Sequence, residues 1–248
     1  MNIVPKESHD CDFSRVRPYI LDGQSVYLRQ TLIFSGFNSP ELNNIYNNHF
    51  KNIQGRIKVT QPYNGTLHET VVQVPQLFHR FDAPNPVEEP DARFQFFIKK
   101  ILPSLSQSAL LQSQTLIFIP SYFDFVRLRN HFKHHEYSFA KLSEYSPNAE
   151  ISRSRGEFFH GKVSFLLVTE RFHFFRRYRI RGAKNIVFYG LPANAHFYSE
   201  LINQMEDTQE SAVMALFTKY DRTRLERIIG SKRVDKMVKG IKDSYMFS

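Results

Sequence analysis

Apolar and polar residues in this chain alternate in short blocks, and the blocks follow two different periods. Uninterrupted apolar blocks of about four to eight residues are typical of strands that are buried on both faces of a parallel sheet. Beyond residue 92 the sequence predicts such strands at Thr115–Ile119, Tyr137–Leu142, Val163–Val168, Asn185–Tyr189 and Ala212–Thr218.

Between these strands the apolar residues recur at the spacing of one helix face. In Tyr122–His134, for example, Phe125, Leu128 and Phe132 fall on the same face. Strands and helices that alternate in this way predict an α/β fold with a doubly wound parallel sheet. The other predicted helices are Arg93–Leu105, Pro147–His160 with Ser146 as its cap, Ala195–Met205, Asp221–Ile229 and Lys232–Tyr245.

The beginning of the chain has a different pattern. Val26–Phe37 is predicted as a strand, and Ser39 caps a predicted helix at about Pro40–Phe50. One strand and one helix cannot form a stable unit. Residues 1–50 are therefore expected to be the C-terminal end of a domain whose earlier part lies upstream, with its apolar side chains poorly covered, above all Leu32, Ile33 and Phe34.

The middle of the chain is predicted as a connector over residues 51–91, followed by a second domain over 92–248. The connector contains two short strand-like segments, Thr70–Val74 and Gln76–Phe81. Strands from about residue 68 can belong to the second domain. Proline and acidic residues then concentrate in 83–91 (APNPVEEPD), which is typical of a surface loop.

Composition limits the kind of protein and its partners. The 248 residues are 42% hydrophobic and 15% aromatic, which indicates a globular chain. The net charge of +9 favours anionic partners, nucleic acid first and a membrane surface second. One cysteine, Cys11, allows neither an internal disulfide nor a zinc site built from several thiolates. No apolar run approaches the roughly 20 residues that span a bilayer.

The segment between Val163–Val168 and Asn185–Tyr189 is both basic and aromatic. Loops at the C-terminal edge of a parallel sheet bind ligands, and cations with aromatic rings are typical of single-strand nucleic-acid sites. An equally simple interpretation is that the rings belong to the core and the cations are merely solvated. The cations are Arg171, Arg176, Arg177, Arg179, Arg181 and Lys184, and the interleaved rings are Phe172, Phe174, Phe175 and Tyr178.

Catalytic and metal-binding patterns are mostly missing. Gly161 and Lys162 are followed by Val163, so they are not part of a phosphate-binding loop. His131, His134 and His135 have a helical spacing that suits a metal, but no cysteine or carboxylate partner accompanies them, so a solvated helix end is the simpler interpretation. No nucleophile–base pair stands out, and the sequence predicts no catalytic residue and no cofactor.

The order of segments resembles the end of the first and the whole second RecA-like domain of a DEAD-box RNA helicase. QTLIFS (30–35) resembles the third motif of that family, Thr115–Ile119 its motif IV strand, and FTKYDR (217–222) the end of the second domain. Longer strings resemble a narrower group, the digestive organ expansion factor family. Those strings are HDCDFSRVRPYILDG, RQTLIFSGFNSPELNN, FFHGK and TERFHFFRRYRIRGAKNIVFYGLP.

This resemblance implies both a fold and a cellular role. Members of the family are helicase-derived factors of the small-subunit processome that associate with the U-three small nucleolar RNA. The implied role is non-catalytic: ribosome biogenesis in the nucleus and nucleolus, supporting pre-rRNA processing and maturation of 18S rRNA and the 40S subunit. The implied partners are the U-three small nucleolar ribonucleoprotein, processome proteins and pre-ribosomal RNA, with no membrane.

The chain departs from working helicases at the positions that contact the nucleotide. By the resemblance, Arg179 stands where helicases have an aspartate, and a cation cannot accept a hydrogen bond from a ribose hydroxyl. The three arginines of motif VI are replaced by Leu201, Gln204 and Asp207. In nucleotide hydrolases, such arginines increase the rate of hydrolysis about 10³–10⁵-fold. The resemblance therefore implies a degenerate, pseudo-helicase domain.

The RNA-facing positions are altered as well. Asn148 and Ile151 replace a Gln-x-x-Arg motif, with Arg153 and Arg155 nearby, whereas Thr169 matches the motif V threonine that lies at the RNA backbone in helicases. Arg176 and Arg177 occupy the Arg-Gly of motif V. The candidate RNA-binding residues are Thr169, Arg171, Arg176, Arg177, Arg179, Arg181, Lys184, Arg153 and Arg155.

Two other functions remain open at this point. One is an RNA-dependent ATPase or helicase whose phosphate-binding loop lies in an upstream half. The other is a basic DNA-binding or nuclease-like module, which would need a cluster of carboxylates to hold a metal.

Overall fold

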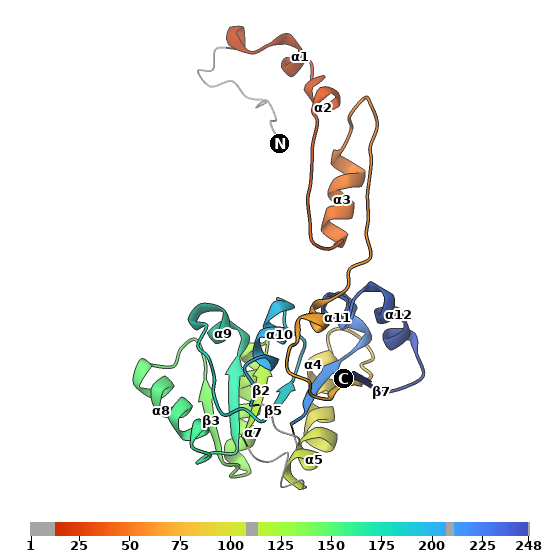
Figure 1. Ribbon diagram of the computed structural model, residues 1–248. Helices are drawn as coiled ribbons and strands as arrows, with labels where there is room; N and C mark the ends of the chain where they lie inside the picture. Colours follow the sequence, from red (N-terminus) through yellow and green to blue (C-terminus); the bar gives the residue numbers. More distant parts are fainter. Residues whose placement is uncertain (1–12, 108–113, 207–210, 248) are drawn as a thin grey trace. The chain divides into compact units, whose positions relative to one another are not determined.

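The structure is a computed structural model, and its chain divides into two compact units, Met1–Gln61 and Pro62–Ser248 (Figure 1). The residues that the structure describes are 13–107, 114–206 and 211–247.

The first unit contains short helical segments and one longer helix, α3 (Pro40–His49). The predicted helix is thus confirmed, and the Ser39 hydroxyl accepts a hydrogen bond from the Leu42 N–H at 3.3 Å. The shorter segments are η1 (Phe13–Arg15), α1 (Pro18–Leu21) and α2 (Ser25–Leu28).

The predicted strand Val26–Phe37 is wrong. Its first residues lie in α2, and the rest is extended chain that pairs with no strand in the described part of the chain. An extended segment becomes a strand only when a neighbour satisfies its backbone N–H and C=O groups. The expected exposure of its apolar side chains is confirmed, since Leu32 is 70% and Phe34 is 93% exposed.

The second unit is built on a seven-stranded sheet with the order β3-β4-β2-β5-β6-β1-β7. All neighbours pair in parallel except β7, which is antiparallel to β1. The predicted α/β fold with a doubly wound parallel sheet is confirmed, and the antiparallel edge strand β7 was not predicted. The strands are β1 (Gln76–Arg80), β2 (Thr115–Ile119), β3 (Phe139–Leu142), β4 (Phe165–Thr169), β5 (Asn185–Phe188), β6 (Val213–Phe217) and β7 (Ser244–Phe247).

Helices cover both faces of this sheet, as Figure 1 shows. Alternate residues of β2 enter two separate cores: Leu116 and Phe118 pack on one face, Ile117 and Ile119 on the other. The first face is covered by α8 (Asn148–Phe159), α9 (Glu170–Arg176), α10 (His196–Ile202), α11 (Arg222–Ile229) and α12 (Ser231–Lys239). The second is covered by α4 (Glu89–Phe96), the π-helical turn η3 (Phe97–Ile101), α5 (Leu102–Gln107) and α7 (Tyr122–His134).

Several predicted boundaries differ from the structure. The helix predicted at Lys232–Tyr245 is wrong beyond Lys239, because the chain turns back as β7 and covers the edge of β1 that would otherwise be open. Thr70–Val74 forms no strand. Ser146 does not cap α8; its hydroxyl accepts from the Ser143 N–H at 3.2 Å instead.

A buried ion pair joins α4 to the segment that follows β6. The Arg93 side chain, 7% exposed, donates from Nη2 to Asp221 Oδ2 at 2.9 Å and also pairs with Glu89. Burial raises the pKa of Glu89, although Arg93 opposes that shift. Gly190 makes room for this arrangement, because a Cβ there would lie 2.6 Å from Arg93 Nη1.

We expect Arg93→Ala to lower the free energy of unfolding by about 3–5 kcal/mol, because it leaves buried carboxylates without their cation. Chemical denaturation of the whole chain measures this. Arg181→Ala is the control: Arg181 is exposed, and its change should shift stability by less than about 0.5 kcal/mol. A loss below about 1 kcal/mol for Arg93→Ala contradicts the importance of the pair.

Candidate nucleic-acid interface

Two neighbouring parallel strands bring the candidate site together. Leu142 of β3 lies beside Val168 of β4, so the segments that follow both strands emerge at the same edge of the sheet. The Thr169 hydroxyl joins the two segments, since it donates to Glu144 Oε2 at 2.9 Å. The Thr169 hydroxyl oxygen also accepts a hydrogen bond from the Phe172 N–H at 3.2 Å, and it thereby caps α9.

The basic–aromatic segment after β4 is not a loop throughout. Its first half is helix α9, which ends where Arg177 adopts a left-handed conformation with φ of 48°. Phe172 and His173 are buried in the core, whereas Phe174 and Phe175 are 56% and 61% exposed. The core interpretation therefore holds for Phe172 but not for Phe174 and Phe175, whose rings are exposed.

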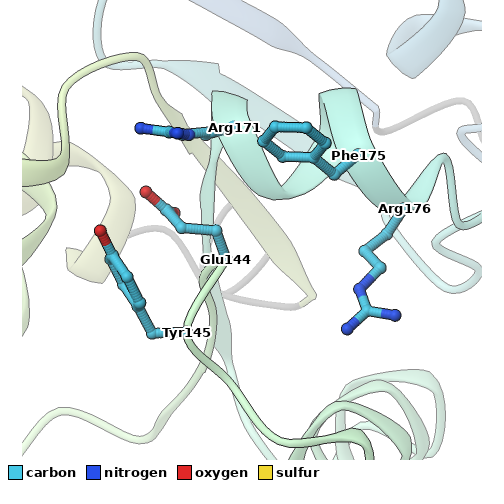
Figure 2. Close-up of a pocket in the computed structure, with 5 residues that line it drawn as sticks. All are labelled: Glu144, Tyr145, Arg171, Phe175 and Arg176. Carbon is cyan, nitrogen blue, oxygen red and sulfur yellow. The ribbon is translucent and has the colours of Figure 1, made fainter.

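A hollow of about 460 Å³ lies between α9 and the segment that follows β3 (Figure 2). The close-up shows Arg171 and Phe175 of α9 on one side and Glu144 and Tyr145 on the other, with Arg176 extending from the last turn of α9. The arginines carry two positive charges and Glu144 one negative charge, so the lining is basic overall.

The structure brings Arg171 and Arg176 into this hollow, and not the other candidate cations. Both side chains are exposed, and no acid pairs with them within the described residues. The Arg171 guanidinium lies 5.6 Å from the centroid of the Phe175 ring. Arg177 is engaged elsewhere, because it pairs with Glu200 and its guanidinium lies 4.8 Å from the Phe197 ring centroid.

Other candidates support the site or lie outside it. Arg155 donates to the Arg179 carbonyl at 3.0 Å and packs 4.7 Å from the centroid of Tyr178, so it braces the chain beyond α9. Thr169 is 1% exposed, and its hydroxyl is already used inside the protein, so it offers no free contact. The remaining candidates do not line the hollow: Arg153, Arg179 and Arg181 are exposed and Lys184 is half-buried.

Two side-chain hydrogen bonds fix α9 to the rest of the unit. Glu170 Oε1 accepts from the Ala193 N–H at 2.9 Å; burial raises the pKa of Glu170, and the backbone donors partly oppose this. His173 Nε2 lies 3.2 Å from Glu200 Oε2, and burial lowers the pKa of His173 although Glu200 acts in the opposite direction. The helix therefore presents its exposed face from a fixed position.

Three residues that the resemblance places at helicase motif positions, Ile151, Leu201 and Gln204, have structural roles here. Leu201 and Ile151 are both 2% exposed and belong to the core. The Gln204 side-chain oxygen accepts from the Ile180 N–H at 3.1 Å. Asn148 is exposed at the start of α8, and Asp207 lies outside the described residues.

Sequence reasoning missed Glu144 and Tyr145. The signal was available, because both residues come directly after a predicted strand, at the edge where the arginines were expected. Glu144 was overlooked in the sequence because a single acid is common in loops, and because its hydrogen-bond partner, Thr169, is distant in sequence.

Within the described ranges, His, Cys, Asp and Glu side chains form no group of three or more that could hold a metal ion. The helices in those ranges are also too short or too polar to cross a bilayer.

The family comparison decides what kind of protein this is. Residues 66–247 match the family described as "Utp25, C-terminal domain", and residues 1–57 match "UTP25, NTP hydrolase-like domain". The chain belongs to the Utp25 family. The predicted family resemblance is thereby confirmed.

Curated relatives in the Utp25 family are similar over most or all of this chain. "U3 small nucleolar RNA-associated protein 25" of Arthroderma benhamiae is 46% identical over 96% of this chain and 35% of its own length. The Homo sapiens homolog of that name is 42% identical over 100% of this chain and 33% of its own length. This chain thus spans about a third of the length of these relatives.

Solved structures with a similar chain path include two DEAD-box proteins. Escherichia coli SrmB is 14% identical, with a TM-score of 0.48 over 62% of this chain and 83% of that one. The C-terminal domain of Dbp5 is 18% identical, with a TM-score of 0.45 over 60% of this chain and 78% of that one. These values add nothing to the topology described above.

Thr169→Val should reduce the free energy of unfolding by about 1–2 kcal/mol, because it removes the cap of α9 and the hydrogen bond to Glu144. Thr169→Ser keeps the hydroxyl and should recover most of this loss. Urea denaturation monitored by circular dichroism checks both variants. Equal stability of the Val and Ser variants would show that the hydroxyl does not join the two segments.

Proposed function

We propose that this chain is part of a non-catalytic, helicase-derived ribosome-biogenesis factor that acts in the nucleolus. Relatives that are 42–46% identical carry the name U3 small nucleolar RNA-associated protein 25, which supports this role. The factor would act in the small-subunit processome, where it supports pre-rRNA processing and maturation of 18S rRNA and the 40S subunit. Its partners would be the U-three ribonucleoprotein, processome proteins and pre-ribosomal RNA.

The hollow at the ends of β3 and β4 is the observation that carries RNA binding. Arg171 and Arg176 offer guanidinium groups that form no ion pair within the described residues, and Phe175 offers an exposed ring in the same hollow. Cations track the backbone of a single strand, and aromatic rings receive its bases. The buried sheet beneath provides a rigid support.

The domain boundaries are part of the same proposal. Residues 1–50 would be the end of a first RecA-like domain, whose remaining strands would pair with the extended chain around Leu32 and Phe34. The exposure of the Leu32 and Phe34 side chains in this chain supports the idea that those strands cover them. Residues 51–91 would connect it to a second RecA-like domain over 92–248, to which β1 contributes a strand.

An RNA-dependent ATPase or helicase is the second candidate. The match of residues 1–57 to an NTP hydrolase-like domain favours it. Against it, Leu201 lies in the core and Gln204 holds the backbone at Ile180, where helicases have charge-stabilising arginines.

Reversing both hollow arginines, Arg171→Glu with Arg176→Glu, should weaken binding of single-stranded pre-ribosomal RNA about tenfold near 0.15 M salt. The estimate follows from the loss of two phosphate contacts, each of which contributes about 0.7 to the logarithmic salt slope. Fluorescence anisotropy across a salt series measures both quantities.

The matched control is Lys99→Glu with Lys133→Glu, which makes the same change in net charge. Both lysines are exposed, on η3 and α7, outside the hollow. The control should lose less than about twofold in affinity. If the two double variants lose affinity equally, RNA binding depends on net charge and not on the hollow.

Full-length protein should hydrolyse ATP no faster with RNA than without it, because no arginine stands at Leu201 or Gln204 to stabilise the transferred phosphoryl group. A steady-state assay with purified protein, compared with a mock preparation, tests this. Turnover that rises with RNA and is missing from the mock preparation would favour the ATPase.

A further inference from the structure

The lining of the hollow does not suit a bare phosphate. The Glu144 carboxylate lines the same hollow as the two arginines, and a phosphate in contact with it would be repelled. Glu144 Oε2 accepts from Thr169, while Oε1 accepts no hydrogen bond within the described residues. Because an ionised carboxylate only accepts hydrogen bonds, a ligand that pairs with this oxygen must carry a donor such as an N–H group.

Two aromatic rings border the same space. Tyr145 is 69% and Phe175 61% exposed, and Figure 2 shows them on opposite sides with the Glu144 carboxylate between. Each ring packs against a second aromatic ring. Tyr122 packs edge-on against Tyr145 at 5.0 Å, and Phe174 packs edge-on against Phe175 at 5.1 Å, both between ring centroids.

The charges and rings of the hollow together exclude a cation and an apolar peptide side chain as its ligand. Aromatic rings with a carboxylate can also hold a cation, but Arg171 and Arg176 outweigh the single negative charge of Glu144. An apolar peptide side chain would cover three charged groups without pairing any of them. The lining fits a ligand that carries an anion, a flat ring and N–H donors on the ring edge, which is the chemistry of a nucleotide.

We propose that the hollow selects one unpaired guanine of a single-stranded RNA. Guanine presents N1–H and N2–H₂ side by side, and both can donate to Glu144. Adenine and cytosine present one amino group, and uracil presents one N–H between two carbonyl oxygens. The base stacks against Tyr145 and Phe175, and its flanking phosphates meet Arg171 and Arg176. This inference rests on the proposed binding of RNA at the hollow.

Labelled uridine hexamers that differ at one central position test the proposal with the whole 248-residue chain. That position is guanine, adenine, cytosine, uracil, hypoxanthine or abasic. By anisotropy we expect guanine to bind about tenfold more tightly than adenine, cytosine or uracil. Hypoxanthine, which lacks the N2 amino group, should fall between, and the abasic hexamer should bind weakest because stacking is lost.

Glu144→Gln should bring the affinity for the guanine hexamer to within twofold of that for the adenine hexamer. The amide keeps an oxygen for the Thr169 hydroxyl, so the fold should be preserved, and a thermal melt checks this. Glu150→Gln is the control: it removes a carboxylate of α8 that pairs with Lys141 outside the hollow, and it should retain the guanine preference.

The outcomes separate this inference from the proposed function. Equal affinity for all hexamers, or a guanine preference that survives in Glu144→Gln, overturns guanine selection and leaves RNA binding intact. Failure of every hexamer to bind overturns both. Free GMP that competes as well as the guanine hexamer shows that the hollow takes a mononucleotide, which overturns selection within RNA.

Discussion

The parallel pairing of β3 with β4 is the constraint on which the candidate site depends. Two strands that run in the same direction must end at the same edge, so the residues that follow them become neighbours. The hydrogen bond from Thr169 to Glu144 then fixes one segment to the other. Without this pairing, Glu144 and Tyr145 would not face the arginines of α9.

Helix α9 shows how one short sequence serves both the core and the surface. Within its two turns Phe172 enters the core, His173 contacts Glu200, and Phe174 and Phe175 point outward. The helical period makes this division, because successive residues face different directions. A flexible loop of the same composition could not hold its exposed rings in place, and it would lose more conformational entropy on binding a base.

Two residues that the resemblance places at helicase motif positions have structural roles in the second unit. Gln204 supports the backbone at Ile180, and Leu201 fills the core beneath α10. The buried pair of Arg93 with Asp221 adds a further polar connection at Gly190, after β5. The contacts of Gln204 and Arg93 join segments that are distant in sequence, whereas Arg171 and Arg176 are exposed on α9, which follows β4.

The sequence by itself determined the elements whose signal is local. Thr115–Ile119 and Tyr122–His134 were predicted at their observed bounds, because a buried apolar block and a helical apolar face are each visible in a few consecutive residues. The basic–aromatic segment was also identifiable from composition, and the parallel direction of the strands followed from the alternation of strands and helices. The family was identifiable from long strings of residues.

Only the tertiary structure decided which residues meet. Val26–Phe37 has the composition of a strand but pairs with no strand among the described residues, and β7 forms from a predicted helix because the edge of β1 is available to it. Arg171 and Arg176 face the hollow whereas Arg177, one residue further along, pairs with Glu200. These outcomes depend on contacts between residues far apart in the chain, and no local pattern of side chains specifies them.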